Sequence, residues 1–504
     1  MNRGYFPSEL PPSFGTRLYA TALTANPASV PPGFSSPPQL AKLGSFSLAR
    51  GNFRFRRHLA LPNPLYFFGL SQCIVQNWGA ISTLCASSPL SKSSPAVNPA
   101  HSREVSPQFK QRDLGRFRAA SRAGCKAILV ADVADFYPAL YTHAIPWVFH
   151  TKATAKANRT PALFGNRIDQ LIRGSQDGQT MGIPIGPDTS FIIAESVLAA
   201  VDIQLTNRMN PLRGLRWMDE FELSFDDRGK AEEALAAMQA ILLQYELRLN
   251  PLKTKISDLP VEFEPEWIAE IRAFSIRTSP IGQASDLLRY FDYITRYLSD
   301  FPNEHVVKYG IGRLRDFQLD LANQGLFQSL ICQAIAVEPG AIREALEAIY
   351  NAEIYRGMTV NSVLLRETVN RIITQNAPSG HDYEVSWCLW ASISWGLSID
   401  NSSATAISSM ENSAVAILAL DAQRRGLIPS GLSVAQWQAR MTTNDLFEEQ
   451  WLLAYEANVQ GWLPSVTGPD HVSVEPNFRF IKQSGVRFYN HTSNPTLGAH
   501  PVYP

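Results

Sequence analysis

The sequence lacks the features that mark several large classes of protein. Only five cysteines occur among 504 residues, without a Cys-x-x-Cys pair or histidines at zinc-ligand spacing, so neither a disulfide framework nor a zinc site is expected. No run of about 18 apolar residues is present to span a bilayer, and the N-terminus lacks the apolar core of a secretion signal. We therefore expect a soluble, cytoplasmic protein without a membrane partner.

An excess of charge of one sign is also absent. The chain carries 45 Lys and Arg against 45 Asp and Glu, a formal net charge of +0, so no global basic excess indicates nucleic-acid binding. Basic residues are nevertheless clustered in two segments that precede the acidic segments considered below. Such clusters are usually solvated surface, but they can also follow a phosphate backbone. The residues predicted to bind nucleic acid are Arg54, Arg56, Arg57, Arg116 and Arg118.

Length and composition predict a folded protein of more than one domain. A chain of 504 residues with 45% hydrophobic side chains is too long for one ordinary core. Residues 86–107 are rich in Ser and Pro, which predicts a flexible surface loop or a linker. Helical periodicity dominates the second half. It predicts either a HEAT-like helical array or an irregular helical bundle. The predicted domains are residues 1–260 and residues 261–504.

Two acidic segments follow strand-like residues. "KAILVADVADFYP" predicts a buried strand that ends at Asp132. "LRWMDEFELSF" alternates between apolar and polar residues, which predicts two short strands joined by an acidic turn at Asp219. Helical patterns lie between and after these strands, so the first domain is predicted to be α+β.

These acids suit one particular chemistry. Joining nucleotides requires two divalent metal ions about 3.5–4 Å apart, and carboxylate oxygens are the ligands that Mg²⁺ prefers. Asp132 and Asp219 alone are weak evidence, because most aspartates at strand ends form turns. The segment between them adds weight: "DGQTMGIPIGPDTSFIIAES" places glycines and prolines ahead of a buried helix, where a base can approach the backbone closely.

The acidic segments and the loop together resemble the palm motifs of reverse transcriptases, in the usual order. "DVADFYP" resembles the first motif, "QTMGIPIGPDTS" the second, "RWMDEF" the third and "RLNPLKTKI" the next. The closer resemblance is to the bacterial defence-associated branch, which includes abortive-infection enzymes, on "RGYFPSELPPSF", "YTHAIPWVFH" and "GVRFYN". It covers nearly the whole chain and implies a right-hand polymerase, with fingers and an antiparallel palm sheet followed by the all-α, HEAT-like domain.

The resemblance also implies roles for individual residues. Asp132, Asp219 and Glu220 would be catalytic and, with the backbone of Val133, would bind Mg²⁺ or Mn²⁺. An aromatic residue at Tyr137 would exclude ribose, so dNTPs are the implied substrates. The implied nucleotide-binding residues are Asp135, Phe136, Tyr137, Gly182, Pro187 and Lys253.

Two positions depart from the family pattern. Glu220 stands where a second Asp is usual; it keeps the charge but adds one methylene, and a displacement near 1 Å can cost on the order of 10²-fold in rate. Met181 stands where many relatives have Gln before Gly182, which predicts unconventional recognition of template or nucleotide.

The resulting expectation is an RNA-directed DNA polymerase that acts in antiphage defence. Its expected partners are dNTPs, an RNA template or an associated noncoding RNA, the DNA product, and a second copy or a partner polymerase subunit. One alternative is a template-independent or protein-primed DNA polymerase, with one of 16 tyrosines as the primer. An alternative of another class is a catalytically lapsed RNA-binding or scaffold subunit of a defence complex.

Overall fold

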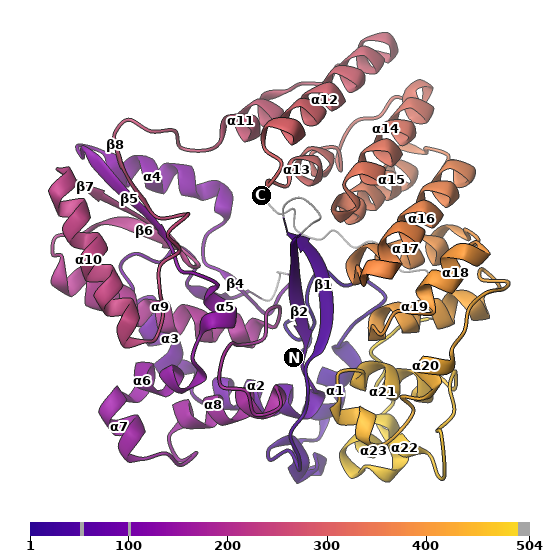
Figure 1. Ribbon diagram of the computed structural model, residues 1–504, viewed down its shortest axis with the longest axis horizontal. Helices are drawn as coiled ribbons and strands as arrows, with labels where there is room; N and C mark the ends of the chain where they lie inside the picture. The colour runs from indigo at the N-terminus through magenta and orange to yellow at the C-terminus, as the bar shows by residue number, and fades with distance from the viewer. Residues whose placement is uncertain (51–54, 99–101, 492–504) are drawn as a thin grey trace.

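The computed structural model describes residues 1–50, 55–98 and 102–491. Two lobes stand side by side, with a β-hairpin between them (Figure 1). One lobe holds a four-stranded sheet and its helices, and the other holds the helices of the second half of the chain. A mixed α/β protein with small antiparallel sheets was predicted and is confirmed.

The larger sheet brings distant segments together. Its strand order is β6-β7-β5-β8, and every neighbouring pair is antiparallel. The strand predicted to end at Asp132 and the hairpin predicted around Asp219 are both present. The four strands are β5 (Ala127–Asp132), β6 (Arg213–Trp217), β7 (Glu220–Phe225) and β8 (Lys255–Asp258).

Helices cover both faces of this sheet. On one face, Leu129, Phe221 and Leu223 are buried with residues of the long helices α9 (Asp188–Arg208) and α10 (Arg228–Gln244). The helix α4 (Leu114–Arg122) contacts β6 and β7. Further helices of this lobe are α5 (Phe136–Ala139), α6 (Ile145–His150), α7 (Lys152–Ala157) and α8 (Phe164–Ser175).

Helix α9 is the core helix of the lobe, as its apolar sequence predicted. By length and composition it is the one helix of the described residues that could cross a membrane, and 78% of its most apolar window is buried inside the fold. Burial of this kind is typical of a central helix in a globular domain.

The Ser/Pro-rich segment 86–107, predicted to be a flexible surface loop or a linker, is packed against the fold over part of its described length. Its described part carries two short strands, β3 (Pro95–Val97) and β4 (Val105–Pro107), and Ser91 forms a parallel bridge with Arg216 of β6. Leu90 and Ser93 are buried. Composition alone does not show that buried carboxylates elsewhere in the chain accept hydrogen bonds from these serine hydroxyls.

The N-terminal segment ties the two lobes together. Strands β1 (Gly44–Arg50) and β2 (Phe55–Leu61) form the hairpin between the lobes. The Ser47 amide donates to Asp382 at 2.9 Å, and the Trp451 indole donates to the Leu61 carbonyl at 2.8 Å, so both strands are hydrogen-bonded to the second half. Three further N-terminal helices are α1 (Arg17–Ala25), α2 (Pro64–Gln76) and α3 (Trp78–Ala86).

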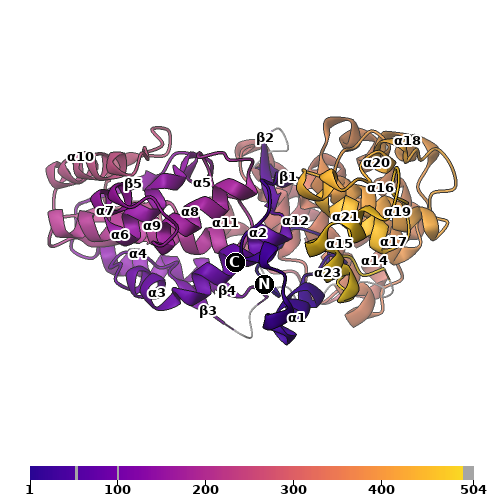
Figure 2. The ribbon, with the colours of Figure 1, turned by 90° about the horizontal axis from the view of Figure 1, so that it is seen from below.

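The second half is all-helical, as predicted. Alternate helices contact one another in two rows: α12, α14, α16 and α18 form one, and α13, α15, α17, α19 and α21 form the other (Figure 1; Figure 2 shows this lobe from below). A two-row stack is the general plan of helical solenoids; the HEAT-like assignment and the boundary at residue 260 stay predictions. The helices are α11 (Glu266–Ala273), α12 (Pro280–Asp300), α13 (Val306–Gly312), α14 (Gln324–Val337), α15 (Ile342–Arg356), α16 (Ser362–Asn376), α17 (Asp382–Trp395), α18 (Asn401–Ile407), α19 (Ser413–Arg424), α20 (Ala435–Gln438), α21 (Trp451–Val459), α22 (His471–Val474) and α23 (Pro476–Gln483).

Candidate functional site

Three carboxylate residues meet at one end of the larger sheet. Asp132, the last residue of β5, is the register partner of Glu220, the first residue of β7. Asp219 lies in the two-residue turn between β6 and β7, and its carbonyl accepts a hydrogen bond from the Val133 amide at 3.2 Å. Strand pairing therefore brings together the residues implied to be catalytic, across 87 positions of sequence (219 minus 132).

Negative charge accumulates at this end of the sheet. Burial raises the pKa of Asp219, and repulsion from Asp132 adds to the effect, while Lys253 and Arg57 oppose it. Desolvation also raises the pKa of Glu220, and the charges of Asp219 and Asp132 raise it further. A carboxylate whose ionised form is disfavoured in this way is stabilised by a bound cation.

The donor chemistry at these acids fits Mg²⁺ or Mn²⁺. Asp132, Asp219 and Glu220 offer hard oxygen ligands of the kind these ions prefer. Among the described residues, however, no three His, Cys, Asp or Glu side chains are already gathered as a metal cluster. Instead, Lys253 Nζ lies 2.9 Å from Asp132 Oδ2, so a cation would compete with the lysine for that oxygen.

The segment after Asp132 holds three of the implied nucleotide-binding residues. Asp135 is exposed and has a φ of 42°, a left-handed conformation that Asp tolerates better than most residues. Phe136 is buried in the core, and the half-buried Tyr137 ring lies 5.8 Å from it. Burial raises the pKa of Tyr137, and the charges of Glu195 and Asp219 raise it further.

Gly182 lies directly against this segment. The Gly182 amide donates to the Leu140 carbonyl and the Ile183 amide donates to the Tyr137 carbonyl, both at 2.9 Å. Gly182 has a φ of 84°, and a Cβ added there would lie 3.1 Å from the Pro138 carbonyl oxygen. The position thus requires glycine for conformation and for space.

Pro187 and Met181 have different surroundings. Pro187 is buried and immediately precedes α9, so it supports the loop from within the fold. Met181 is 55% exposed, which leaves its thioether accessible to a ligand beside Gly182.

A cleft of about 310 Å³ adjoins the acids. Asp132, Glu220 and Lys253 line it together with Trp217 and Lys255. Among its lining residues, Lys253 is the one implied nucleotide-binding residue, whereas Tyr137 and Gly182 are not part of the lining. The cleft therefore adjoins Asp132 and Glu220, and the segment around Tyr137 lies outside it.

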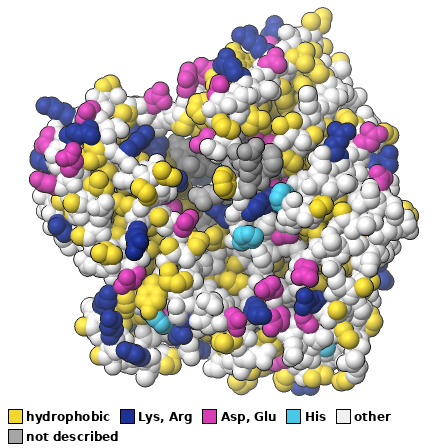
Figure 3. Space-filling model, viewed as in Figure 1, with side chains coloured by type: hydrophobic (Ala, Val, Ile, Leu, Met, Phe, Trp, Pro, Cys, Tyr) yellow, Lys and Arg dark blue, Asp and Glu magenta, His cyan; other side chains and the backbone are white. Residues whose placement is uncertain are grey.

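Two of the basic residues predicted to bind nucleic acid have charges that act on the acids, namely Arg118, which lines the cleft with Glu220, and Arg57. Arg57 is exposed on β2, and its charge acts on Asp219, Tyr137 and His305. Figure 3 shows a hollow between the lobes, with Lys, Arg and His side chains near the hairpin. Arg57 is thus placed where a negatively charged strand could pass the acids.

Apart from Arg57, the predicted basic residues have mostly structural partners. Arg56 binds Glu384 of the helical lobe through two 2.8 Å contacts, and Arg118 binds Glu222 at 3.0 Å. Arg116 is exposed, with Asp113 3.9 Å away. Arg54 lies outside the described residues. The interpretation of Arg56 as a phosphate contact is corrected, because a buried carboxylate holds its guanidinium.

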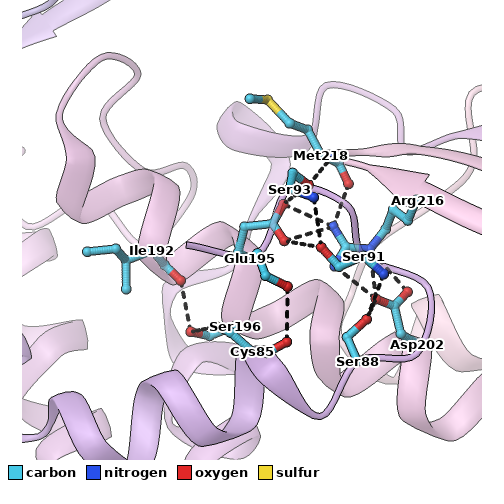
Figure 4. Close-up of polar contacts among 11 residues, drawn as sticks. Cys85, Ser88, Ser91, Ser93, Ile192, Glu195, Ser196, Asp202, Arg216 and Met218 are labelled. Carbon is cyan, nitrogen blue, oxygen red and sulfur yellow. Dashed lines mark hydrogen bonds and ion pairs between the residues drawn. The ribbon is translucent and has the colours of Figure 1, made fainter. Parts of the chain in front are cut away.

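A buried charge network supports the turn that carries Asp219 (Figure 4). Arg216 of β6 has a relative exposure of 0% and forms ion pairs with Asp202 at 2.8 Å and Glu195 at 3.0 Å, both on α9. The hydroxyls of Ser88, Ser91 and Ser93 donate hydrogen bonds to these two carboxylates.

Sequence reasoning missed this network, although a signal was present. Glu195 and Asp202 lie seven residues apart in an otherwise apolar helix, a spacing of about two turns that places them on one face. Carboxylates in a buried helix require partners, and Arg216 in the following strand is a cation close to them in sequence. The serines could not be identified from sequence, because composition placed them in a loop.

Met218, the first residue of the turn, has a φ of 52°. Two-residue hairpin turns usually carry Gly, Asn or Asp where φ is positive, and other residues in such conformations cost about 1–3 kcal/mol. The surrounding structure therefore has to hold this turn in place.

Comparisons with known proteins give no close relative. No family model matches the chain, and no curated protein matches it. Among solved structures, the chain is similar to apo telomerase from Candida tropicalis, at 10% identity and a TM-score of 0.33 over 76% of this chain and 71% of that one. It is also similar to telomerase from Candida albicans in complex with a TWJ fragment of telomeric RNA, at 13% identity and a TM-score of 0.31 over 80% and 69%. Both TM-scores are below 0.5.

Proposed function

We propose that this protein is a reverse-transcriptase-like nucleotidyltransferase that adds dNTPs to a growing DNA strand. The observation that carries the proposal is the meeting of Asp132, Asp219 and Glu220 at one end of an antiparallel sheet. The motif resemblance, in which these acids follow the order of the palm motifs, supports the same conclusion.

The residues around the acids have distinct roles in this proposal. Asp132, Asp219, Glu220 and the backbone of Val133 would hold Mg²⁺ or Mn²⁺, which supplies charge stabilisation for in-line phosphoryl transfer. Lys253, next to Asp132, would turn to the phosphates of the incoming nucleotide. Tyr137 would pack against the deoxyribose and exclude a 2′-hydroxyl.

The nucleic acid would approach along the exposed basic side of the hairpin. Arg57 is the residue placed to contact its phosphates, and phosphate contacts of this kind give affinity without reading sequence. An RNA template or associated noncoding RNA, a cytoplasmic location and a role in antiphage defence belong to the proposal through the motif resemblance alone.

Primer extension on two RNA templates of different sequence, with a no-template control, tests the templated activity. The proposal predicts product only with RNA, and a product sequence complementary to each template. The same product with and without RNA would instead support the template-independent or protein-primed alternative.

A scaffold function is the second candidate, and one specific observation favours it. Glu220 replaces the usual second Asp of the third motif, as expected if the site no longer binds metal. Absence of any product with Mg²⁺ or Mn²⁺ would favour this candidate over a polymerase.

A further inference from the structure

The two peptide groups on either side of Met218 are each held by a buried side chain (Figure 4). The Met218 amide donates to Ser93 Oγ at 2.7 Å, and the Met218 carbonyl accepts from Arg216 Nη1 at 2.7 Å. Both Ser93 and Arg216 have relative exposures of 0%. The second of these peptide groups leads directly into Asp219.

Glu195 joins the two holding groups. Its Oε1 atom accepts from Ser93 Oγ at 2.8 Å and from Arg216 Nη1 at 3.0 Å. Arg216 is in turn held by Asp202. The turn is thus attached to α9, the core helix of the lobe, through a closed set of charge-assisted hydrogen bonds.

Of the three acids Asp132, Asp219 and Glu220, Asp219 depends most on this attachment for its position. Asp132 and Glu220 are placed by strand pairing, since they are register partners in the sheet. Asp219 lies between the strands, so the direction of its side chain depends on the conformation of the turn. That conformation includes the positive φ of Met218, which the local sequence does not favour.

We propose that Ser93 and Arg216 are positioning residues, which fix the Asp219 carboxylate relative to Asp132 and thereby set the spacing of the oxygen donors offered to a divalent cation. Both side chains act on Asp219 through the Met218 turn, and their contacts are with Met218 and with the carboxylates of α9. The consequence for catalysis rests on the proposed function, whereas the consequence for cation binding does not.

The test compares two neighbouring buried serines. Ser93→Ala removes the acceptor of the Met218 amide and a donor to Glu195. Ser94→Ala is the matched control, because Ser94 Oγ donates to the Cys85 carbonyl at 3.2 Å, away from the turn and from Glu195. Arg216→Ala is unsuitable, because it would leave two buried carboxylates without their cation and endanger folding.

Mn²⁺ binding to the full-length, nucleotide-free protein, followed by electron paramagnetic resonance, is the primary readout, and thermal melting controls for folding. Groups that orient metal ligands typically change affinity by about 10–100-fold when removed. We expect Ser93→Ala to weaken Mn²⁺ binding about 10-fold while Ser94→Ala binds as wild type. In dNTP incorporation, Ser93→Ala should lower kcat more than it raises KM.

The outcomes separate this proposal from the proposed function. Wild-type Mn²⁺ affinity in a folded Ser93→Ala variant, with binding abolished by Asp219→Asn, would overturn the positioning role and leave the polymerase intact. Weakened Mn²⁺ binding in Ser93→Ala, in a protein that incorporates no nucleotide, would uphold the positioning role and contradict the polymerase. A wild-type protein that binds no Mn²⁺ would overturn both.

Discussion

Lys253 Nζ lies 2.9 Å from Asp132 Oδ2. The two partners differ in surroundings: the lysine side chain is 47% exposed, whereas that of the aspartate is 8% exposed. The lysine can therefore leave for solvent or for a phosphate, while the carboxylate stays at the end of β5. We interpret the contact as a temporary pairing that a cation and a nucleotide would replace together.

Replacement of this lysine should have opposite effects on metal binding and on catalysis. Lys253→Met frees Asp132, so we expect Mn²⁺ to bind the nucleotide-free protein about 3–10-fold more tightly, while dNTP incorporation falls about 10–100-fold through a higher KM because a phosphate contact is lost. Lys255→Met is the control, since Lys255 lines the same cleft. Unchanged Mn²⁺ affinity in Lys253→Met would contradict the interpretation.

The partly buried carboxylate of Asp219 predicts a pH-dependent gain in stability when its charge is removed. Burial raises the pKa of Asp219 above its ordinary 3.8, so the folded state binds this proton more tightly than the unfolded state. The resulting destabilisation is absent below about pH 3.8 and complete above the raised pKa. Thermal melts should therefore show Asp219→Asn gaining Tm over wild type as pH rises from about 4 to about 8.

Asp226→Asn is the control for this series. Asp226 lies at the surface in an ion pair with Lys230 at 3.1 Å, so its replacement shows what the loss of an exposed carboxylate does to Tm. The Tm difference between Asp219→Asn and wild type could instead narrow as pH rises. That result would show that the fold stabilises the charged carboxylate, which is the opposite of the effect expected from its burial.

Tyr137 is expected to decide which sugar the site accepts. Removal of the half-buried ring in Tyr137→Ala opens space beside the acids, so ribonucleotide incorporation relative to deoxyribonucleotide should rise about 10²-fold, the size of steric discrimination against one hydroxyl. Competition assays with paired rNTP and dNTP measure the ratio. Tyr141→Ala is the control, because that ring packs 6.0 Å from Trp147; equal ratios in the two variants would remove the assigned role.

Arg56 should matter for stability and not for nucleic-acid binding. Its guanidinium contacts Glu384, whose side chain is 0% exposed, across 328 positions of sequence. Arg56→Ala leaves a buried carboxylate without its partner, at a cost of about 3 kcal/mol measured by urea unfolding. Arg116→Ala, at a side chain 63% exposed, should cost less than about 0.5 kcal/mol. Wild-type stability with weakened RNA binding in Arg56→Ala would restore the phosphate-contact interpretation.

Local patterns were enough to predict the elements that carry the acids. Apolar residues before Asp132 predicted β5, and alternation around Asp219 predicted the β6–β7 hairpin, because the buried face of a sheet selects every second residue. The apolar run in residues 188–208 likewise predicted a buried helix. These features depend on neighbours in sequence, so the sequence alone displays them.

The contacts that hold those elements in place were beyond such patterns. Ser93 was assigned to a flexible loop because its partners, Met218 and Glu195, lie about a hundred residues or more away in sequence. Arg56 was assigned to a phosphate because its partner Glu384 belongs to the other lobe. Hydrogen bonds and ion pairs between residues so far apart in sequence depend on the folded topology. Composition does not show which residues will be partners.

Incorporation of labelled dTTP on poly(rA) primed with oligo(dT), in Mg²⁺, by wild type, Asp132→Asn and Asp219→Asn tests the central claim most directly. Both replacements keep the shape of the side chain and remove the charge that would hold the cation. We predict incorporation by wild type and a loss of at least about 10³-fold in each variant. Incorporation at the wild-type rate by either folded variant would contradict a metal-dependent polymerase at these acids.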